Sequence, residues 1–339
     1  MENKLSYVAA CPFNFSNDLG ERVLWEITFK CNLRCRHCLY YVDEKRFSDD
    51  LTLCQIKTIV DSMKKSNVKY IWLSGGEPLI RLDIFDIVEY ITQKDIVASL
   101  STNGTLIDSE DYANRLKKAG ISYVHISLDG VSPGVHDKLR GAVGSYEKTV
   151  RAISYLVNAK IKVGISFMVT ETSINEVCEM IFFAKSIGVS ILSFYLVAPI
   201  GRGKKFDYND HIQLALRLKD IVDKVDDKTG LKIETIRIPQ KGSLLDYCSA
   251  EKFLTITNSG QLSSCPWLEK KEVIEKVSLL EMDFCEAEKL IVERTKDYIS
   301  NWHNSICKKC SKERDCGKGC PAVCLKGQSD PLCMCINKA

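Results

Sequence analysis

Short apolar segments alternate with amphipathic helical stretches from residue 22 to residue 204, and this order constrains the fold more than any other feature. Six of the segments are rich in β-branched and aromatic residues and are bounded by turn residues, as buried strands are. They cover residues 23–28, 70–75, 97–103, 123–129, 162–169 and 191–198. The alternation predicts an α/β fold of parallel βα units, and we predict a partial (β/α)6 barrel of the TIM type. No Gly-x-Gly-x-x-Gly motif follows the first strand, which disfavours a dinucleotide-binding fold.

Polar side chains recur at every second position of these strands, and alternate residues of a strand point to opposite faces of a sheet. The shared face holds Glu26, Thr28, Ser99, Ser101, Asn103, His125, Ser127, Asp129, Ser166 and Thr170. The opposite face is apolar and is expected to contact the helices. We therefore expect a polar barrel lumen that accepts a polar ligand, with His125 and Tyr195 as candidate catalytic residues. His125 is also typical of a hydrogen-bonded interior histidine.

Three cysteines, Cys31, Cys35 and Cys38, directly follow the first predicted strand in the stretch "CNLRCRHC". Parallel barrels carry their chemistry at this end of the strands. Cysteinates at such spacings hold iron-sulfur clusters, and three ligands leave one iron of a 4Fe-4S cluster open. A structural zinc site needs four ligands, so zinc completed by His37 is the alternative.

The cysteine motif is followed by "SGGEP" at 74–78, "STNG" at 101–104, "SLDG" at 127–130 and "HDKLRG" at 136–141. Together these motifs resemble the radical S-adenosylmethionine (radical SAM) superfamily over about residues 22–204. His37 departs from the family, which usually has an aromatic residue before the third cysteine. The resemblance implies a 4Fe-4S cluster on the three cysteines, whose open iron binds S-adenosylmethionine. Its reductive cleavage would give a 5'-deoxyadenosyl radical that abstracts hydrogen from a substrate.

The resemblance also implies a set of cofactor-binding residues, namely Ser74, Gly75, Gly76, Glu77, Pro78, Ser101, Asn103, Ser127, Asp129 and Arg140. The two glycines would let the backbone approach the cofactor closely. Glu77 would accept a hydrogen bond from its ammonium group, and Arg140 would bind its carboxylate. Ser127 would reach the carboxylate or the ribose.

After residue 245 the composition changes: most of the sixteen cysteines follow, and apolar periodicity is weak. We expect bound metal to hold this region together, because it lacks the pattern of a core. Its cysteine spacing resembles the SPASM extension, a small domain with two auxiliary 4Fe-4S clusters, which would make three clusters in all. The implied ligands are Cys248, Cys265 and Cys320 for the nearer cluster, and Cys307, Cys310, Cys316 and Cys333 for the farther one.

The sequence does not assign the fourth ligand of the nearer auxiliary cluster. It would be Cys324, Cys335 or Cys285, or the fourth iron would have no protein ligand. A pair of zinc ribbons is the alternative for this region. Cys11, Cys54 and Cys178 fit buried apolar positions and are expected to pack as small hydrophobic residues. The predicted division of the chain is an N-terminal extension (1–21), the barrel (22–204), a bridging helix and strand (205–245) and the SPASM domain (246–339).

The charge balance and the hydropathy of the sequence exclude some classes of partner. The 47 basic residues nearly balance the 44 acidic ones, so no strong field favours nucleic acid. No apolar run approaches the roughly 20 residues of a membrane helix, and no signal peptide stands at the N-terminus, so we expect a cytoplasmic protein without membrane contact. Only about twenty residues precede the first strand. A peptide substrate would then be recognised by the barrel itself or by a separate leader-binding protein.

The sequence therefore predicts an enzyme, a radical SAM/SPASM oxidoreductase or peptide maturase that crosslinks or oxidises a ribosomally made peptide. Pro266 stands where sulfatase maturases carry an aspartate that acts as a base, which disfavours sulfatase maturation. The alternative is haem-precursor processing by oxidative decarboxylation or side-chain removal, with Arg202, Lys204 and Lys205 binding carboxylates. A non-enzymatic iron-sulfur or zinc-ribbon protein is a distant alternative. A low-potential electron donor such as ferredoxin or flavodoxin is the expected redox partner.

Overall fold

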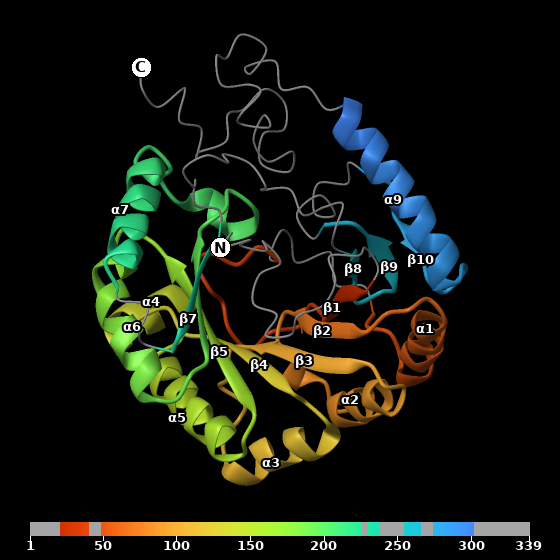
Figure 1. The fold of residues 1–339 in the computed structure, drawn as a ribbon, viewed down its shortest axis with the longest axis horizontal. Helices are drawn as coiled ribbons and strands as arrows, with labels where there is room; N and C mark the ends of the chain where they lie inside the picture. The colour runs from red at the N-terminus through yellow and green to blue at the C-terminus, as the bar shows by residue number, and fades with distance from the viewer. Residues whose placement is uncertain (1–20, 41–48, 226–229, 237–253, 266–273, 302–339) are drawn as a thin grey trace.

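The computed structural model describes residues 21–40, 49–225, 230–236, 254–265 and 274–301, and these form a curved sheet with helices along its outer side (Figure 1). The strands are β1 (Arg22–Thr28), β2 (Tyr70–Gly75), β3 (Val97–Thr102), β4 (Tyr123–Ser127), β5 (Lys162–Val169), β6 (Ile191–Leu196), β7 (Lys232–Ile236), β8 (Leu254–Ile256), β9 (Gln261–Ser263) and β10 (Val277–Ser278). Their order in the sheet is β10-β9-β8-β1-β2-β3-β4-β5-β6-β7.

The helices follow the strands in alternation. The α-helices are α1 (Leu53–Lys65), α2 (Ile84–Gln93), α3 (Glu110–Ala119), α4 (Pro133–Arg140), α5 (Ser145–Asn158), α6 (Val177–Ser186), α7 (His211–Asp223) and α9 (Phe284–Asn301). Three short 3-10 helices are η2 (Pro78–Ile80), η3 (Ser173–Glu176) and η4 (Gly201–Lys205). Local signals set the helix ends: Thr52 and Gln55 form a reciprocal capping box at the start of α1, and Gly120 ends α3 with a φ of 105°.

All six predicted strands are confirmed as β1 to β6, and each pairs with its neighbour in parallel. The predicted α/β barrel architecture is therefore confirmed. The structure also adds a seventh parallel strand, because β7 pairs with β6 and places Glu234 opposite Ser193. The segment predicted as a bridge thus contributes a strand to the barrel sheet.

The two faces of the strands differ as their sequence pattern predicts. Apolar residues of one parity, such as Leu73, Ile126 and Phe167, are fully buried between the sheet and the helices. Burying a side chain of this size stabilises the fold by about 1.5–3 kcal/mol. The other parity is polar and faces the concave side.

The described part of residues 246–339 packs onto the barrel sheet. β8 runs parallel to β1, and β9 and β10 extend the sheet as antiparallel strands. Ile256, Leu262 and Phe284 are buried in the same core as the barrel. These strands are only two or three residues long, too short to show a periodic pattern in the sequence.

Within the described ranges, every helix falls short of the length and hydropathy that crossing a lipid bilayer would require.

Candidate functional site

The site is built around residues 29–40, here called the cysteine loop, which leave β1 at the C-terminal edge of the sheet. The loop contains little regular structure, so its backbone groups need partners elsewhere. Three segments distant in sequence supply them, one after β2, one at the end of α4 and one after β6. Each of these segments includes a glycine that lies against the loop backbone.

The segment after β2 makes the closest approach. Gly76 N donates to Thr28 O over 2.7 Å, and Glu77 N donates to Lys30 O over 2.8 Å. A Cβ on Gly76 would lie 2.2 Å from Lys30 O, and one on Gly75 would lie 2.2 Å from Thr28 O. The glycines of the "GGEP" motif are therefore required by backbone packing against the cysteine loop, a role additional to the cofactor contact predicted for them.

The end of α4 and the turn after β6 hold the loop in a similar way. Arg36 N donates to Leu139 O over 2.8 Å, and a Cβ on Gly141 would lie 2.7 Å from Arg34 O. After β6, Arg202 N donates to Cys38 O over 2.9 Å. A Cβ on Gly201 would lie 2.5 Å from the same oxygen. The "HDKLRG" motif and the segment "PIGRGK" at 199–204 thus meet at the cysteine loop.

Side chains after β3 support the loop from the remaining direction. Asn103 Nδ2 donates to Asn32 Oδ1 over 2.9 Å, and Asn32 Nδ2 donates to Thr105 Oγ1 over 2.8 Å. Asn103 is the predicted cofactor residue of "STNG", and here it orients the residue next to Cys31. Asn32 and Thr105 were missed by the sequence reasoning, and their only signal was proximity to recognised motifs.

The three thiols lie near enough to one another to interact electrostatically. Cys35 is buried, which raises the pKa of its thiol, while the charge of Arg140 opposes that shift. Cys31 reaches the surface, yet the protein behind it desolvates the thiol and, with help from the charges of Glu77, Cys35 and Cys38, raises its pKa to about 12. Cys31 and Cys35 are therefore expected to be uncharged until metal displaces their protons.

The three thiols and the cation beside them are the groups that this site offers to a metal cofactor. In the part of the chain that the structure describes, no three His, Cys, Asp or Glu side chains converge as a single metal ion would require. His37, the alternative zinc ligand, instead has its Nε2 atom 3.9 Å from Asp129 Oδ2. Arg140 Nη1 lies 3.8 Å from Cys35 Sγ, so a cation faces the buried thiol. These residues fit an iron-sulfur cluster held by thiolates.

Asp129 is fully buried and organises the "HDKLRG" motif. Its Oδ2 lies 2.7 Å from Arg140 Nε in an ion pair, and its Oδ1 accepts a hydrogen bond from Met168 N over 2.8 Å. Its own backbone N donates to His136 Nδ1 over 3.1 Å. Burial is the largest influence on the pKa of Asp129 and would raise it, but the charge of Arg140, together with His37, His136 and the hydrogen bond from Met168 N, holds the pKa below its ordinary value. Asp129 thereby fixes Arg140 at the mouth of the barrel.

The buried histidines His136 and His125 are expected to make the stability of the folded chain depend on pH. Burial lowers the pKa of each to about 4, whereas an unfolded histidine titrates near 6.5. Between these values the unfolded chain takes up protons that the folded chain does not, so the histidines reduce stability as pH falls from 6.5 to 4. His136→Asn keeps an acceptor for Asp129 N and removes one titrating group. Urea unfolding between pH 4 and 7 should show a slope lower by about one proton per molecule; an unchanged slope would refute this assignment.

Glu77 connects the ends of β2 and β3 from a fully buried position. Its Oε1 accepts from Thr102 Oγ1 over 2.7 Å and from Leu79 N over 3.1 Å. Its Oε2 accepts from Asn103 N over 2.8 Å. Burial raises its pKa to about 7, although these bonds favour the carboxylate. Its side chain therefore positions the "STNG" segment, and the predicted contact with a cofactor ammonium stays a prediction.

Glu77→Gln is expected to lower the free energy of unfolding by about 1–3 kcal/mol, because an amide NH2 replaces one oxygen that accepts hydrogen bonds. The matched control is Glu89→Gln, which removes an exposed carboxylate on α2. Urea unfolding of both variants measures the difference. Equal stabilities would show that the three donors around Glu77 find other partners.

The concave face presents a row of uncharged side chains. Among the described residues, those of the inward parity that are partly exposed are Trp72, Ser74, Ser101, Ser127, Ser166, Met168 and Tyr195. The carboxylates on this face, Glu26 and Glu234, are buried. The predicted polar lumen is therefore present. Its accessible wall is neutral toward the C-terminal ends of the strands, whereas Lys162 and Lys232, of the same parity, are exposed where β5 and β7 begin.

His125 lies in the middle of this wall. Its ring contacts the rings of Trp72 and Tyr195, with centroids 5.7 Å and 6.3 Å away, and Ser166 Oγ lies 3.1 Å from its Nε2. A Cβ on Gly164 would lie 1.9 Å from the Tyr123 hydroxyl, so the glycine of β5 leaves room for aromatic rings. Since His125 is buried, it is placed to support this wall, and Tyr195 is the more accessible of the two catalytic candidates.

Other predicted residues fall elsewhere. Pro78 opens η2 beneath the loop, and Thr170, predicted on the lumen side, lies beyond β5 because that strand ends at Val169.

Cys54 and Cys178 are exposed on α1 and α6, which corrects the prediction that they are buried; each occupies the solvent side of its helix. Cys265 follows β9 and Cys285 begins α9, both partly buried. Cys11, Pro266 and the remaining cysteine ligands lie outside the described residues; these ligands are Cys248, Cys307, Cys310, Cys316, Cys320, Cys324, Cys333 and Cys335.

Comparison with known proteins gives one family and several relatives. Residues 25–184 match the radical SAM superfamily. The Fe-coproporphyrin III synthase of Methanosarcina barkeri is 33% identical over 58% of this chain and 49% of its own length. The mycofactocin maturase MftC of Mycobacterium tuberculosis is 37% identical over 53% of this chain and 45% of its own length. The matched region thus spans about half the length of these curated relatives.

A solved structure supports the fold over a longer range. Streptococcus suis SuiB, bound to its precursor peptide SuiA, superposes with a TM-score of 0.73 at 18% identity, covering 93% of this chain and 74% of SuiB. At this level of identity the similarity concerns the fold.

Proposed function

Because residues 25–184 form a radical SAM domain, we propose that this chain is an enzyme that cleaves S-adenosylmethionine reductively and modifies a peptide. A radical SAM domain implies one 4Fe-4S cluster, which supplies the electron for this cleavage and so yields the 5'-deoxyadenosyl radical. Cys31, Cys35 and Cys38 would hold the cluster. The chain's own contribution is to fix their loop, which it does through three backbone contacts and the Asn32 to Asn103 hydrogen bond.

Residues around the loop are suited to bind S-adenosylmethionine. Arg140 carries a positive charge at the mouth of the barrel and is held there by Asp129, so it can bind a carboxylate. Ser127 is partly exposed on the adjacent strand end and offers a hydroxyl. Buried groups around Asp129 exclude water from this wall, which strengthens the electrostatic contacts there.

The neutral wall of the lumen is the observation that favours a peptide substrate. Its accessible side chains are hydroxyl, aromatic or thioether groups, which suit the amide groups and side chains of a peptide. A tetrapyrrole with several carboxylates would require cations at this wall. Two similarities are in line with this proposal. One relative is a mycofactocin maturase, and the chain shares its fold with SuiB, whose structure holds the precursor peptide SuiA.

Haem-precursor processing is the second candidate, favoured by the 33% identity to Fe-coproporphyrin III synthase. Arg202, Lys204 and Lys205 are the basic residues that the sequence suggested for binding substrate carboxylates. The backbone N of Arg202 donates to the cysteine loop, and Lys204 and Lys205 are exposed. We also propose the two auxiliary clusters, a low-potential electron donor and a leader-binding partner, on the sequence pattern alone. Changing Cys310 should then spare uncoupled cleavage of S-adenosylmethionine and stop product formation.

The test is anaerobic reconstitution with iron and sulfide, followed by reduction and addition of S-adenosylmethionine. We expect release of 5'-deoxyadenosine and about four irons per cluster. No release from a fully loaded protein would refute the proposed chemistry, and stoichiometric zinc would favour zinc ribbons in the C-terminal region. A porphyrin polycarboxylate that stimulated the release would favour the second candidate over a peptide.

A further inference from the structure

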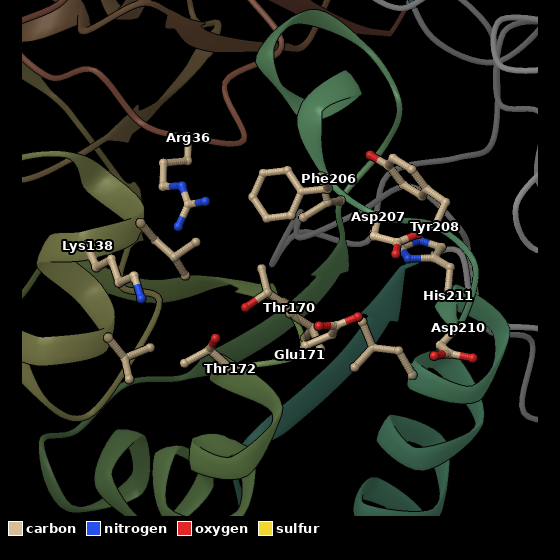
Figure 2. Close-up of a pocket in the computed structure, with 15 residues that line it drawn as sticks. Arg36, Lys138, Thr170, Glu171, Thr172, Phe206, Asp207, Tyr208, Asp210 and His211 are labelled. Carbon is tan, nitrogen blue, oxygen red and sulfur yellow. The ribbon is translucent and has the colours of Figure 1, made fainter.

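A cavity of about 180 Å³ lies beside the cysteine loop, between α4, the turn after β5 and the beginning of α7; we call it the α4/α7 pocket (Figure 2). Its apolar lining includes Leu139, Val169 and Phe206. The pocket is separate from the neutral wall of the lumen, whose residues do not line it. Of its lining residues, Arg36 belongs to the cysteine loop, where it lies between two of the predicted ligands.

Opposite charges face each other across this pocket. Figure 2 shows Arg36 and Lys138 on one side, Asp207 and Asp210 on the other, and Glu171 between them. All five side chains belong to exposed residues, and within the described part of the chain none of them forms an ion pair. The pocket therefore offers both a cationic and an anionic wall to a ligand.

The walls are held in place before any ligand binds. Arg36 N donates to Leu139 O over 2.8 Å, and the Arg36 guanidinium lies 5.8 Å from the centre of the Phe206 ring. On the other side, Tyr208 Oη donates to Gly203 O over 2.8 Å, and the Tyr208 and His211 rings pack with centroids 4.9 Å apart. A pocket with fixed walls loses little freedom on binding.

Several ligand classes fit this pocket poorly. A metal ion is disfavoured because no three ligating side chains of the described residues converge here. A polyanion would meet three carboxylates against two cations. The volume is below the roughly 300–1,000 Å³ of typical small-molecule sites, so a macrocycle is too large. An apolar amino-acid residue flanked by groups of both charges matches the lining.

We propose that the α4/α7 pocket binds a peptide segment in which an apolar residue stands between an acidic and a basic group. The acidic group pairs with Arg36 and Lys138, the basic group pairs with Glu171, Asp207 and Asp210, and the apolar side chain packs on Phe206 and Val169. This inference rests on the proposed function, because it supplies that enzyme with a recognition site for its peptide outside the lumen. Contact with Arg36 places the bound segment against the loop that carries the candidate cluster ligands.

The experiment titrates blocked tripeptides into the full-length, anaerobically reconstituted protein and measures binding by saturation-transfer NMR. The probes are glutamate-leucine-lysine, its reversed order, and three analogues in which glutamine replaces the acid, the base or both. At least one amphoteric order should bind about fivefold more tightly than either singly charged analogue, as an accessible ion pair allows. Equal binding of the fully neutral analogue, or binding of none of the peptides, would overturn the proposal.

Substitutions locate the binding. Lys138→Gln and Glu171→Gln should each weaken the amphoteric probe by about fivefold. The matched controls, Lys148→Gln and Glu147→Gln, remove exposed charges on α5 and should bind like the unsubstituted protein. Pocket variants that bind like these controls would overturn the proposal. Release of 5'-deoxyadenosine by the unsubstituted protein is measured in the same samples, so a failed pocket is distinguished from a failed assignment of the enzyme.

Discussion

Alanine in place of Gly76 is expected to prevent the chain from holding its candidate iron-sulfur cluster. The added Cβ would lie 2.2 Å from Lys30 O and 2.7 Å from Phe29 O, and both are backbone atoms of the cysteine loop. Neither atom can rotate away, so the loop itself must move by about 1 Å, and a displacement of that size costs about 100-fold in catalysis. The expected result is loss of bound iron together with loss of 5'-deoxyadenosine release.

The chain supplies a matched control for this substitution. Gly134 lies in α4, and a Cβ there would meet no atom within 4 Å. Gly134→Ala should therefore load iron as the unsubstituted protein does, and helix propensity even favours the alanine by up to about 1 kcal/mol. Circular dichroism should show that both variants retain the barrel. If Gly76→Ala bound as much iron as Gly134→Ala, the glycine would not position the loop.

Cys35→Ala should abolish reductive cleavage of S-adenosylmethionine and reduce bound iron by about four atoms per chain. Cys35 is the buried member of the three cysteines, and Arg140 Nη1 lies 3.8 Å from its sulfur. With only two thiolates left, a second iron of the cluster lacks a protein ligand, and Arg140 loses its anionic neighbour. Iron analysis, electron paramagnetic resonance of the reduced protein and chromatography of 5'-deoxyadenosine measure the outcome.

Cys54→Ala is the control for a general effect of removing a thiol. Cys54 is exposed on α1 and lies outside the cysteine loop, so its substitution should change neither iron content nor cleavage. A Cys35→Ala protein that still released 5'-deoxyadenosine would contradict the assignment of this cysteine. The same loss of iron in both variants would instead indicate damage to the fold.

Much of the barrel and the three candidate ligands follow from short-range patterns. β2 and β5 begin and end at the predicted residues, because apolar alternation and turn residues specify a strand over six to eight positions. The short strands β8 to β10 escaped prediction because they carry too few residues for a periodic signal. Cys54 and Cys178 were misplaced because the identity of a cysteine says little about which side of a helix it occupies.

The sequence by itself determined the order of strands and helices and the motifs that surround the site, since each depends on neighbours a few residues apart. Tertiary structure alone decided what those motifs contact. Arg140 and Cys35 are 105 residues apart, and Asn103 and Asn32 are 71 apart, yet each pair meets at one loop. Parallel strands bring their C-terminal ends to one edge of the sheet, so residues remote in sequence meet there only after the sheet has formed.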